Sequence, residues 1–587
     1  MATHDLIIRG GTVLDGTGAP ARTADVAVRD GVITEVGRVD GRAARTIDAD
    51  GLLVTPGFVD IHAHYDGQAS WDERMIPSSW HGVTTVVAGN CGVGFAPVRP
   101  ADHQRLIELM EGVEDIPGTV LTEGLSWEWE TFPEFLDAVD GRPFDIDVAL
   151  QVPHGALRLN VMGERGAAGE PATAEDIAAM ARIAREGVEA GALGFTTSRT
   201  LNHKTSRGEP TPTLTAEAAE LVGIARAIGE SGRGVLQVVS DFFDVDAEFS
   251  IFRRMAAESG RPLSFSLVQA RKLDWRRALE LLEQANADGV TMAAQVAPRA
   301  VGLLLGLQCT LHPLVTNPVF RDEVAGRPLA EMVGLLRDGA RRQRILAAEA
   351  PRKEPNRLGG RLIQAFDAMY VLGDPPDYEP DPTTSIGRRA ARAGRDPLEE
   401  AYDFLLAEEG RAFLYLPLLN YVDGNLDAAG EMLAHPHTIP GLGDGGAHVS
   451  TICDASFPTT LLELWGRDRD RGRLGLADLV RQHTRDTART VGLLDRGVLA
   501  RGHRADVNLI DFDGLAARRP EMRHDLPSGG RRLVQPADGY EATIVAGEVT
   551  YERGEATGAL PGRLVRGQQP APTTGTRTTG ATTGGAP

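Results

Sequence analysis

Short apolar runs alternate with helical segments through most of this 587-residue chain. Continuous apolar strands are typical of a parallel sheet buried on both faces, with helical crossovers joining the strands. About eight repeats over roughly 430 residues favour a TIM-like (β/α)8 barrel. A doubly wound sheet is the less favoured alternative, because no G-x-G-x-x-G fingerprint follows a first strand. The runs read GVTTVVAGN, FDIDVALQVPHG, ALGFTTS, GVLQVVSDF and PLSFSLVQ.

The two ends of the chain differ from this middle. Residues 1–56 and 491–565 read as short strands punctuated by glycine-rich turns, and we predict that they form one small β-sandwich domain. The barrel then spans 57–490. Within it, 308–440 is too long for a simple connection, so we predict an insertion or lid with its own helices. Residues 566–587, rich in Pro, Thr and Gly, are predicted to be a disordered tail.

Composition narrows the class of protein. The formal net charge of -21 disfavours general nucleic-acid binding. The three cysteines are too few and too scattered for a disulfide framework, which favours a reducing compartment. No signal peptide is recognisable, and no apolar run reaches the ~18 residues of a membrane helix. We expect a cytoplasmic protein that acts on a small molecule without a membrane or nucleic-acid partner; the sequence does not indicate an oligomeric state.

Two histidines stand in the stretch GFVDIHAHYDGQ, at His62 and His64. Side chains two apart share one face of a strand, and active sites of barrels lie at the C-terminal ends of the strands. Two imidazoles in this position can bind one metal ion, although a solvated or core pair of histidines has the same spacing. We favour the metal because the pair ends the first barrel strand, directly after PGFVD.

Two further candidates follow later strands. Cys91 ends the run TTVVAGNCG, where a thiolate can ligate a metal, although a free cysteine is often only a small buried side chain. Asp444 lies among glycines in GLGDGGAHVS, where the backbone can approach a ligand closely. A carboxylate there can hold a metal and accept a proton from water, although a turn aspartate is equally typical of D-G sequences.

These stretches resemble the amidohydrolase superfamily, and most closely its N-acyl-D-amino-acid deacylase (D-aminoacylase) branch. The resemblance covers roughly residues 5–565 and rests on four segments: PGFVDIHAHYDGQ, HGVTTVVAGNCGVGFAPVRP, EGVEDIPGTVLTEGLSWEWETFPEFLDA and GLGDGGAHVS. It implies a TIM-like barrel, a small β domain from both termini, zinc, and hydrolysis of an N-acyl amide of a D-amino acid. On that pattern His62 and His64 match the first-strand histidines, Cys91 the second-strand ligand, and Asp444 the catalytic aspartate.

The sequence departs from this pattern at two positions. Members of the branch carry a histidine at the ends of strands five and six, whereas the regions here read LQVVSDF and LSFSLVQ. By this placement Val239 and Leu267 stand at the histidine positions, and neither can bind a metal. His154 and His203, which follow strands three and four, are candidate substitute ligands or simply loop residues. Weaker oxygen ligands are Asp241 and Gln269, and GFTTS offers no lysine to bridge two metals.

Three cations lie near predicted strand ends, where each can bind a substrate carboxylate or serve as an ordinary structural cation: Arg199, Lys272 and Arg299.

The favoured hypothesis is a hydrolase of amide C–N bonds that carries one Zn2+ ion, with an N-acyl amino acid as substrate. One alternative is a divergent reaction on the same fold, such as opening of a cyclic amide or a decarboxylation. Another is a metal-poor binding protein without catalysis.

Overall fold

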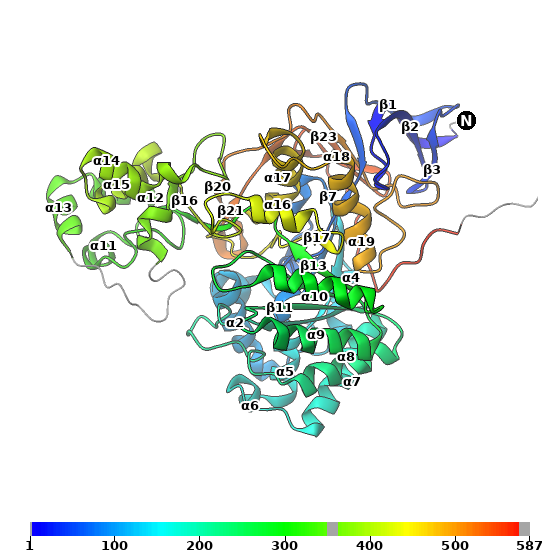
Figure 1. Cartoon of the computed structure of the whole chain (residues 1–587), viewed down its shortest axis with the longest axis horizontal. Coiled ribbons are helices and arrows are strands. Elements are labelled where there is room, and N and C mark those ends of the chain that lie inside the picture. Colours follow the sequence, from blue (N-terminus) through cyan, green and yellow to red (C-terminus); the bar gives the residue numbers. More distant parts are fainter. Residues whose placement is uncertain (1–2, 349–361, 574–587) are drawn as a thin grey trace, which may run out of the picture.

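The computed structural model describes residues 3–348 and 362–573. Parallel strands occupy the centre of the molecule in two sheets (Figure 1). The first sheet contains β6 (Phe58–Asp60), β7 (Val83–Ala88) and β8 (Asp147–Leu150). The second has the order β17-β13-β12-β11-β10-β9, with β9 (Val152–Pro153), β10 (Gly194–Arg199), β11 (Val235–Ser240), β12 (Leu263–Ser266), β13 (Met292–Val296) and β17 (Thr438–Pro440).

The two sheets meet at both edges. On one side only Gln151 separates β8 from β9, and its N–H donates to the Ala88 carbonyl at 3.0 Å. On the other side a parallel bridge joins Ala63, just after β6, to Gly445, just after β17. The strands are thus two abutting parallel sheets and not one uninterrupted eight-stranded ladder. This α/β arrangement agrees with the predicted fold class and carries the C-terminal ends of β6, β7 and β17 to one place.

Helices follow the strands and cover the outside of the sheets (Figure 1). Adjacent helices in this layer pack against one another, as α7 does with α8 and α8 with α9. A capping box starts α7, because the Thr173 hydroxyl accepts the Asp176 N–H and the Asp176 carboxylate accepts the Thr173 N–H. The main helices are α7 (Ala174–Ala190), α8 (Ala218–Glu230), α9 (Val245–Ser259) and α10 (Trp275–Ala287).

Both ends of the chain contribute to one further sheet. Strand β5 (Leu53–Pro56) pairs antiparallel with β18 (Val507–Ile510), which joins the N-terminal strands to the C-terminal ones. The result is a single nine-stranded sheet where a sandwich was predicted. The remaining strands of this sheet are β1 (His4–Val13), β2 (Arg22–Arg29), β3 (Val32–Gly37), β4 (Ala43–Asp48), β23 (Tyr540–Val545), β24 (Glu548–Glu552) and β25 (Glu555–Ala556).

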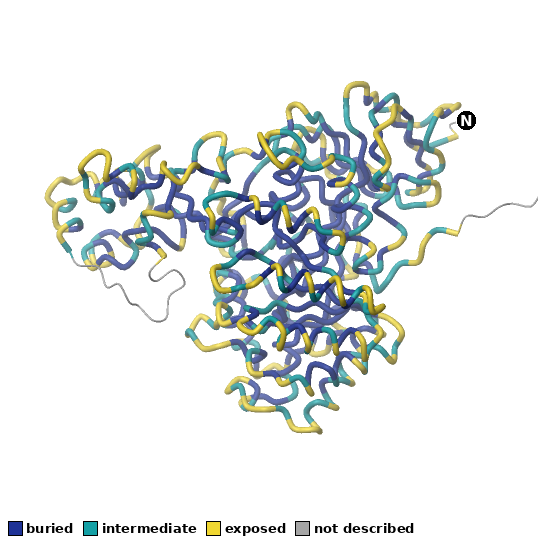
Figure 2. Tube along the Cα trace, viewed as in Figure 1, coloured by how far each residue is buried: buried dark blue, intermediate teal, exposed yellow. Residues whose placement is uncertain are grey.

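The segment between β13 and β17 has its own hydrophobic cluster and projects from the body of the molecule (Figures 1 and 2). Its sheet consists of β14 (Val301–Leu305), β16 (Leu414–Leu419) and β15 (Tyr370–Val371). Strand β17 lies within the predicted insertion 308–440, but it pairs with β13 and so belongs to the central sheet. The sequence did not reveal this strand because three residues are too few to give a strand signal. The helices are α11 (Pro318–Glu323), α12 (Leu329–Leu336), α13 (Gly339–Ala347), α14 (Ile386–Ala393) and α15 (Pro397–Leu405).

The start of the predicted tail is attached to the body. The N–H of Gly567 donates to the Gly191 carbonyl at 2.8 Å, and that of Gln569 to the Gly492 carbonyl at 3.0 Å. Disorder is therefore a wrong prediction for this part, and residues 574–587 lie outside the described residues. No helix in 3–348 or 362–573 is long and apolar enough to cross a bilayer.

A buried ion cluster ties the central sheets to the C-terminal segment. The Asp147 carboxylate on β8 is fully buried and pairs with Arg496 at 2.7 Å and Arg504 at 2.9 Å. We expect Asp147→Asn to lower the free energy of unfolding by about 1.5–3 kcal/mol, because it removes a charged hydrogen-bond acceptor that two arginines share, while Arg496 keeps Asp495 and Arg504 keeps Asp506. Urea unfolding measures the loss. Glu186→Gln, in the exposed pair with Arg182, is the control and should change nothing measurable; an equally stable Asp147→Asn protein contradicts the prediction.

Candidate metal centre

The two strand-end histidines lie side by side in the interior. His62 and His64 follow β6, are 1% and 2% exposed, and have ring centroids 5.6 Å apart. Cys91, in the turn η2 (Asn90–Gly92) after β7, places its sulfur 3.2 Å from Nε2 of His62. One ligand atom from each of the three residues lies within 4.8 Å of the others. Two imidazoles and a thiol in this arrangement are able to hold a metal ion.

Asp444 completes the cluster. Its Oδ1 lies 3.3 Å from Nε2 of His62 and 3.5 Å from Nε2 of His64. The residue has a positive φ of 46°, and its N–H donates to the His62 carbonyl at 3.0 Å. Space is short on either side of it, because a Cβ on Gly445 would clash with Ser78 at 2.5 Å and one on Gly443 would lie in tight contact with Asp60 at 3.0 Å. The glycines around Asp444 therefore let its turn close over the histidines, and its role as a ligand stays a prediction.

Mutual pairing keeps these buried groups charged. Burial alone would raise the pKa of the Cys91 thiol, but the charge and hydrogen bond of His62 outweigh burial, so the pKa lies below its usual value. Burial lowers the pKa of His62, yet Cys91 and Asp444 raise it to about 9. For Asp444, burial is outweighed by His64 and His62, which hold the pKa below its ordinary value. A divalent cation would replace the protons of this cluster and balance the thiolate and carboxylate.

Polar side chains lie behind both imidazoles of the cluster. Nδ1 of His62 lies 2.7 Å from Oε1 of Gln295 on β13, whose amide nitrogen donates to the Ser264 hydroxyl at 2.9 Å. His62 thus donates from Nδ1 and keeps Nε2 for a metal. Nδ1 of His64 lies 3.2 Å from Oε1 of Glu114, at the end of α2 (His103–Glu114). Sequence reasoning missed Gln295 and Glu114; the only signal for Glu114 was the stretch EGVEDIPG.

No further imidazole joins the cluster within the described residues. Val239 lies in β11 and is half-buried, and Leu267 follows β12 in the hydrophobic core. The β11 side chain that reaches the cluster is Gln237, whose Oε1 accepts the Cys91 N–H at 3.2 Å. Amide side chains, not histidines, therefore face the cluster from β11 and β13.

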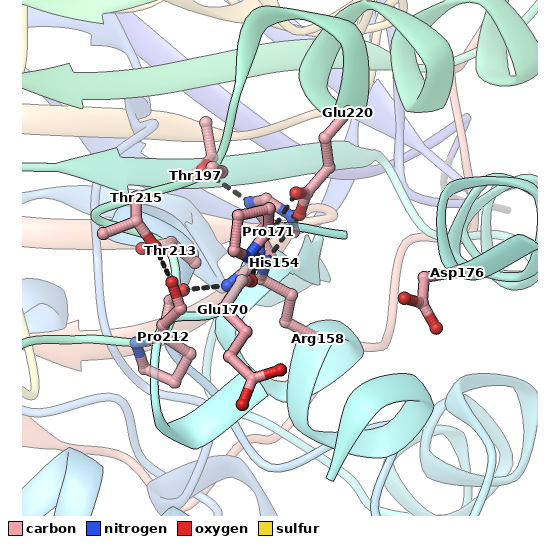
Figure 3. Close-up of polar contacts among 12 residues, drawn as sticks. His154, Arg158, Glu170, Pro171, Asp176, Thr197, Pro212, Thr213, Thr215 and Glu220 are labelled. Carbon is pink, nitrogen blue, oxygen red and sulfur yellow. Dashed lines mark hydrogen bonds and ion pairs between the residues drawn. The ribbon is translucent and has the colours of Figure 1, made fainter. Parts of the chain in front are cut away.

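His154 is not a substitute ligand, because both of its ring nitrogens are occupied elsewhere. Nδ1 lies 2.8 Å from the Thr197 hydroxyl and Nε2 lies 2.9 Å from Oε1 of Glu220. Arg158 pairs with the same Glu220 oxygen at 2.7 Å (Figure 3). His154 belongs to a structural network between α5 (His154–Met162), β10 and α8, and its sequence position after a strand gave no sign of this.

His203 is the better placed of the two. Its Nδ1 lies 2.9 Å from the Ser198 hydroxyl at the end of β10. Burial, together with the nearby charges of His448 and His64, lowers the pKa of His203 to about 3, so the ring stays neutral. It is not part of the group of ligand atoms described above. The two oxygen candidates have other partners: Asp241 binds Thr200 and Leu201, and Gln269 binds Asp423.

Two of the three candidate cations are unavailable to a substrate. Arg199 forms a bidentate pair with Glu248 at 2.7 and 2.8 Å. Arg299 is 1% exposed, binds Asp454 at 3.2 Å, and stacks on Tyr378 at 3.6 Å. Both arginines therefore form structural ion pairs, the alternative that the sequence left open. The sequence did not show these pairs because both partners lie far away along the chain. Lys272 is exposed on the loop after β12.

The sequence profile of the amidohydrolase family matches residues 45–551. The chain belongs to this family. An uncharacterized protein of Mycobacterium tuberculosis is 28% identical and covers 95% of this chain and 93% of its own length. The D-aminoacylase of Alcaligenes xylosoxydans xylosoxydans is 35% identical over 194 residues, which are 33% of this chain and 37% of that enzyme.

Solved structures give the same picture of the fold. A D-aminoacylase structure matches with a TM-score of 0.63 and 24% identity over 96% of this chain and 100% of that one. An N-acyl-D-glutamate deacylase from Bordetella bronchiseptica, complexed with zinc and a phosphonate inhibitor, matches with a TM-score of 0.62 and 25% identity, covering 96% and 99% of the two chains. The amidohydrolase fold and the family resemblance are thus confirmed.

In the metal-free protein we expect a single thiol, Cys91, to titrate below the ordinary pKa of about 8.5. Burial raises the pKa of Cys309 to about 12 and that of Cys453 well above its usual value, so neither contributes at neutral pH. The ultraviolet thiolate absorbance that develops at the lowest pH should disappear in Cys91→Ser. In His62→Gln the midpoint should move to higher pH, because the positive charge next to the sulfur is lost. Identical titrations of the wild type and Cys91→Ser would contradict this.

Proposed function

We propose that this chain is a metal-dependent hydrolase of amide C–N bonds that deacylates an N-acyl (D-)amino acid or a related small amide. The observation that carries the proposal is the convergence of His62, His64, Cys91 and Asp444 at the C-terminal ends of three strands. Support comes from membership of the amidohydrolase family and from the 35% identity to D-aminoacylase over a third of the chain. A barrel enzyme places its catalytic groups at this end of its strands.

We infer further that the two parallel sheets act as one TIM-like barrel. The bridge from Ala63 to Gly445 supports this, because it joins the first and last strands beside the cluster. The continuity of β8 and β9 around Gln151 supports it on the opposite side.

The donor set fits one Zn2+ ion. Zinc prefers imidazole nitrogen, thiolate sulfur and carboxylate oxygen, and these three types of donor atom are supplied by four residues, His62, His64, Cys91 and Asp444. When bound, the ion lowers the pKa of a water to near ~7 and polarises an amide carbonyl. The four side chains would hold it, and Gln295 would fix the orientation of the His62 imidazole.

Asp444 is the proposed proton carrier. Its carboxylate is ionised and, with 16% of its side chain exposed, it is the most open of the four groups. It accepts a proton from the attacking water and returns one to the leaving nitrogen, so that the amide becomes a carboxylic acid and a free amine. His62 and His64 keep its Oδ1 next to the reacting centre.

A second reaction on the same site has one observation in its favour. The amides of Gln237 on β11 and Gln295 on β13 lie next to Cys91 and His62, and no imidazole reaches the cluster from these two strands in the described part of the chain. Amides donate and accept hydrogen bonds without adding charge, which suits a polar cyclic amide or a decarboxylation substrate as well as a linear N-acyl group.

Metal analysis tests the first proposal. We expect about one zinc per chain, lost in His62→Ala and His64→Ala, because each removes a ligand from a small set. His154→Ala is the matched control: it also removes a buried histidine but should retain the metal. A folded wild-type protein without bound metal overturns the proposal and favours the non-catalytic alternative.

Substrate class is tested by release of free amine from N-acetyl-D-amino acids and their L-isomers, with hydantoin-type cyclic amides as the competing class. We expect Asp444→Asn to lower kcat/KM by about 100-fold or more, because the proton acceptor is lost, while Cys91 and the histidines still bind metal. Unchanged kcat/KM in Asp444→Asn removes Asp444 from the mechanism. Turnover of cyclic amides alone would favour the second reaction.

A further inference from the structure

The stretch EGVEDIPG, residues 111–118, has no role in the proposed chemistry although it lies beside the site. It forms the last turn of α2, the left-handed residue Asp115 with a φ of 52°, and the start of α3 (Gly118–Gly124). A Cβ on Gly112 would meet the Lys204 carbonyl at 2.2 Å, so glycine allows this end of α2 to press against the loop after β10. The stretch is built to bring one helix end close to the metal cluster.

Glu114 is the residue that this packing buries. It is 1% exposed and is placed at the C-terminal end of a helix, where the helix dipole and the loss of water both disfavour a carboxylate. A buried charge in such a place requires compensating partners. Hydrogen bonds do not supply them, since Oε2 of Glu114 and Nδ1 of His64 both lack a hydrogen-bond partner in the described part of the chain.

Two imidazoles compensate the charge. Oε1 of Glu114 lies 3.2 Å from Nδ1 of His64, and Oε2 lies 3.7 Å from Nε2 of His448. His64 ends β6, whereas His448 follows β17 on the turn that carries Asp444. One carboxylate therefore spans the two segments that must converge at the metal.

The turn that carries Asp444 needs such an attachment. Leu442, Asp444 and His448 have φ values of 62°, 46° and 48°, in the left-handed region that is unfavourable for residues other than glycine. Backbone contacts hold both ends of the turn: His64 N–H donates to the Gly445 carbonyl at 2.7 Å, and Leu533 N–H to the Val449 carbonyl at 2.6 Å. Between these two backbone contacts, the carboxylate of Glu114 adds an ion pair with His448.

We propose that Glu114 is a positioning residue that sets the geometry of the metal centre. It faces Nδ1 of His64 while Asp444 faces Nε2, so Glu114 orients the ligand from behind and does not share the ion. Through His448 it also holds the Asp444 turn over the two histidines. The inference rests on the proposed metal site, and carboxylates behind ligating histidines typically change metal affinity about 10- to 100-fold.

The test is the zinc affinity of the full-length protein, measured by competition with a chelator. We expect Glu114→Gln to bind zinc about 10- to 100-fold more weakly. The matched control is Glu111→Gln, on the same helix, where the carboxylate accepts only the Gly118 N–H at 2.9 Å; its affinity should not change. The visible bands of the Co2+-loaded protein should also change in Glu114→Gln alone, which a general loss of stability would not produce.

A double-mutant cycle tests the shared carboxylate. If Glu114 acts through both imidazoles, His448→Gln should weaken zinc binding in the wild type and have almost no further effect in Glu114→Gln. Losses that multiply in the double variant overturn the link to His448. Wild-type zinc affinity and unchanged Co2+ bands in Glu114→Gln overturn the proposal as a whole.

Failure of the metal hypothesis remains distinguishable from failure of this one. If the wild type binds neither zinc nor cobalt, the proposed function fails. Crystal structures of metal-free Glu114→Gln and Glu111→Gln then decide the positioning role. It requires that the distances from Asp444 to His62 and His64 lengthen only in Glu114→Gln, and unchanged distances overturn it.

Discussion

Burial of four ionisable side chains at one point is the constraint on which the rest of the site depends. The imidazole of His62 lies within hydrogen-bond or ion-pair distance of the Cys91 thiol and the Asp444 carboxylate, the carboxylate also contacts His64, and all four side chains are largely removed from water. Isolated charges in such a place would be prohibitively costly, whereas paired charges or a bound cation make the arrangement stable. The surrounding structure serves this cluster: Gln295 and Glu114 orient the rings, and two glycines let the Asp444 turn approach.

The mouth of the site is braced by chain segments that are distant in the sequence. The hairpin of β20 (Glu521–Leu526) and β21 (Gly530–Val534) contacts the turn after Asp444 through Leu533 and Val449. Thr310, at the start of the projecting segment, donates its N–H to the Ser450 carbonyl and its hydroxyl to Asp115. The C-terminal hairpin and the projecting segment therefore act on the same turn, and changes in either one can reach Asp444 without touching the metal ligands.

The part of the site that the strands carry was predictable. Side chains two residues apart lie on the same face of a strand, and active sites lie at the C-terminal ends of parallel barrel strands. This placed His62 and His64 on one face and Cys91 and Asp444 near them. Glu114 was not predictable, since a glutamate in a helix is usually exposed and nothing local marks its burial. The structural roles of the cations and of His154 were not predictable for a related reason. Their partners are distant in the sequence: Arg199 pairs with a residue 49 positions away and His154 with one 66 positions away. Periodicity does not reveal such partners.

The residues opposite the histidines favour one ion over two. A second divalent cation would need additional anionic or imidazole donors from β11 and β12, but the side chain that reaches the cluster from β11 is Gln237. Its oxygen already accepts the Cys91 N–H, and its amide nitrogen is buried without a hydrogen-bond partner among the described residues. An N–H donor in that place repels a cation and attracts an oxygen atom. Gln237 thus places a neutral amide donor beside Cys91, where an oxygen atom is a more favourable neighbour than a cation.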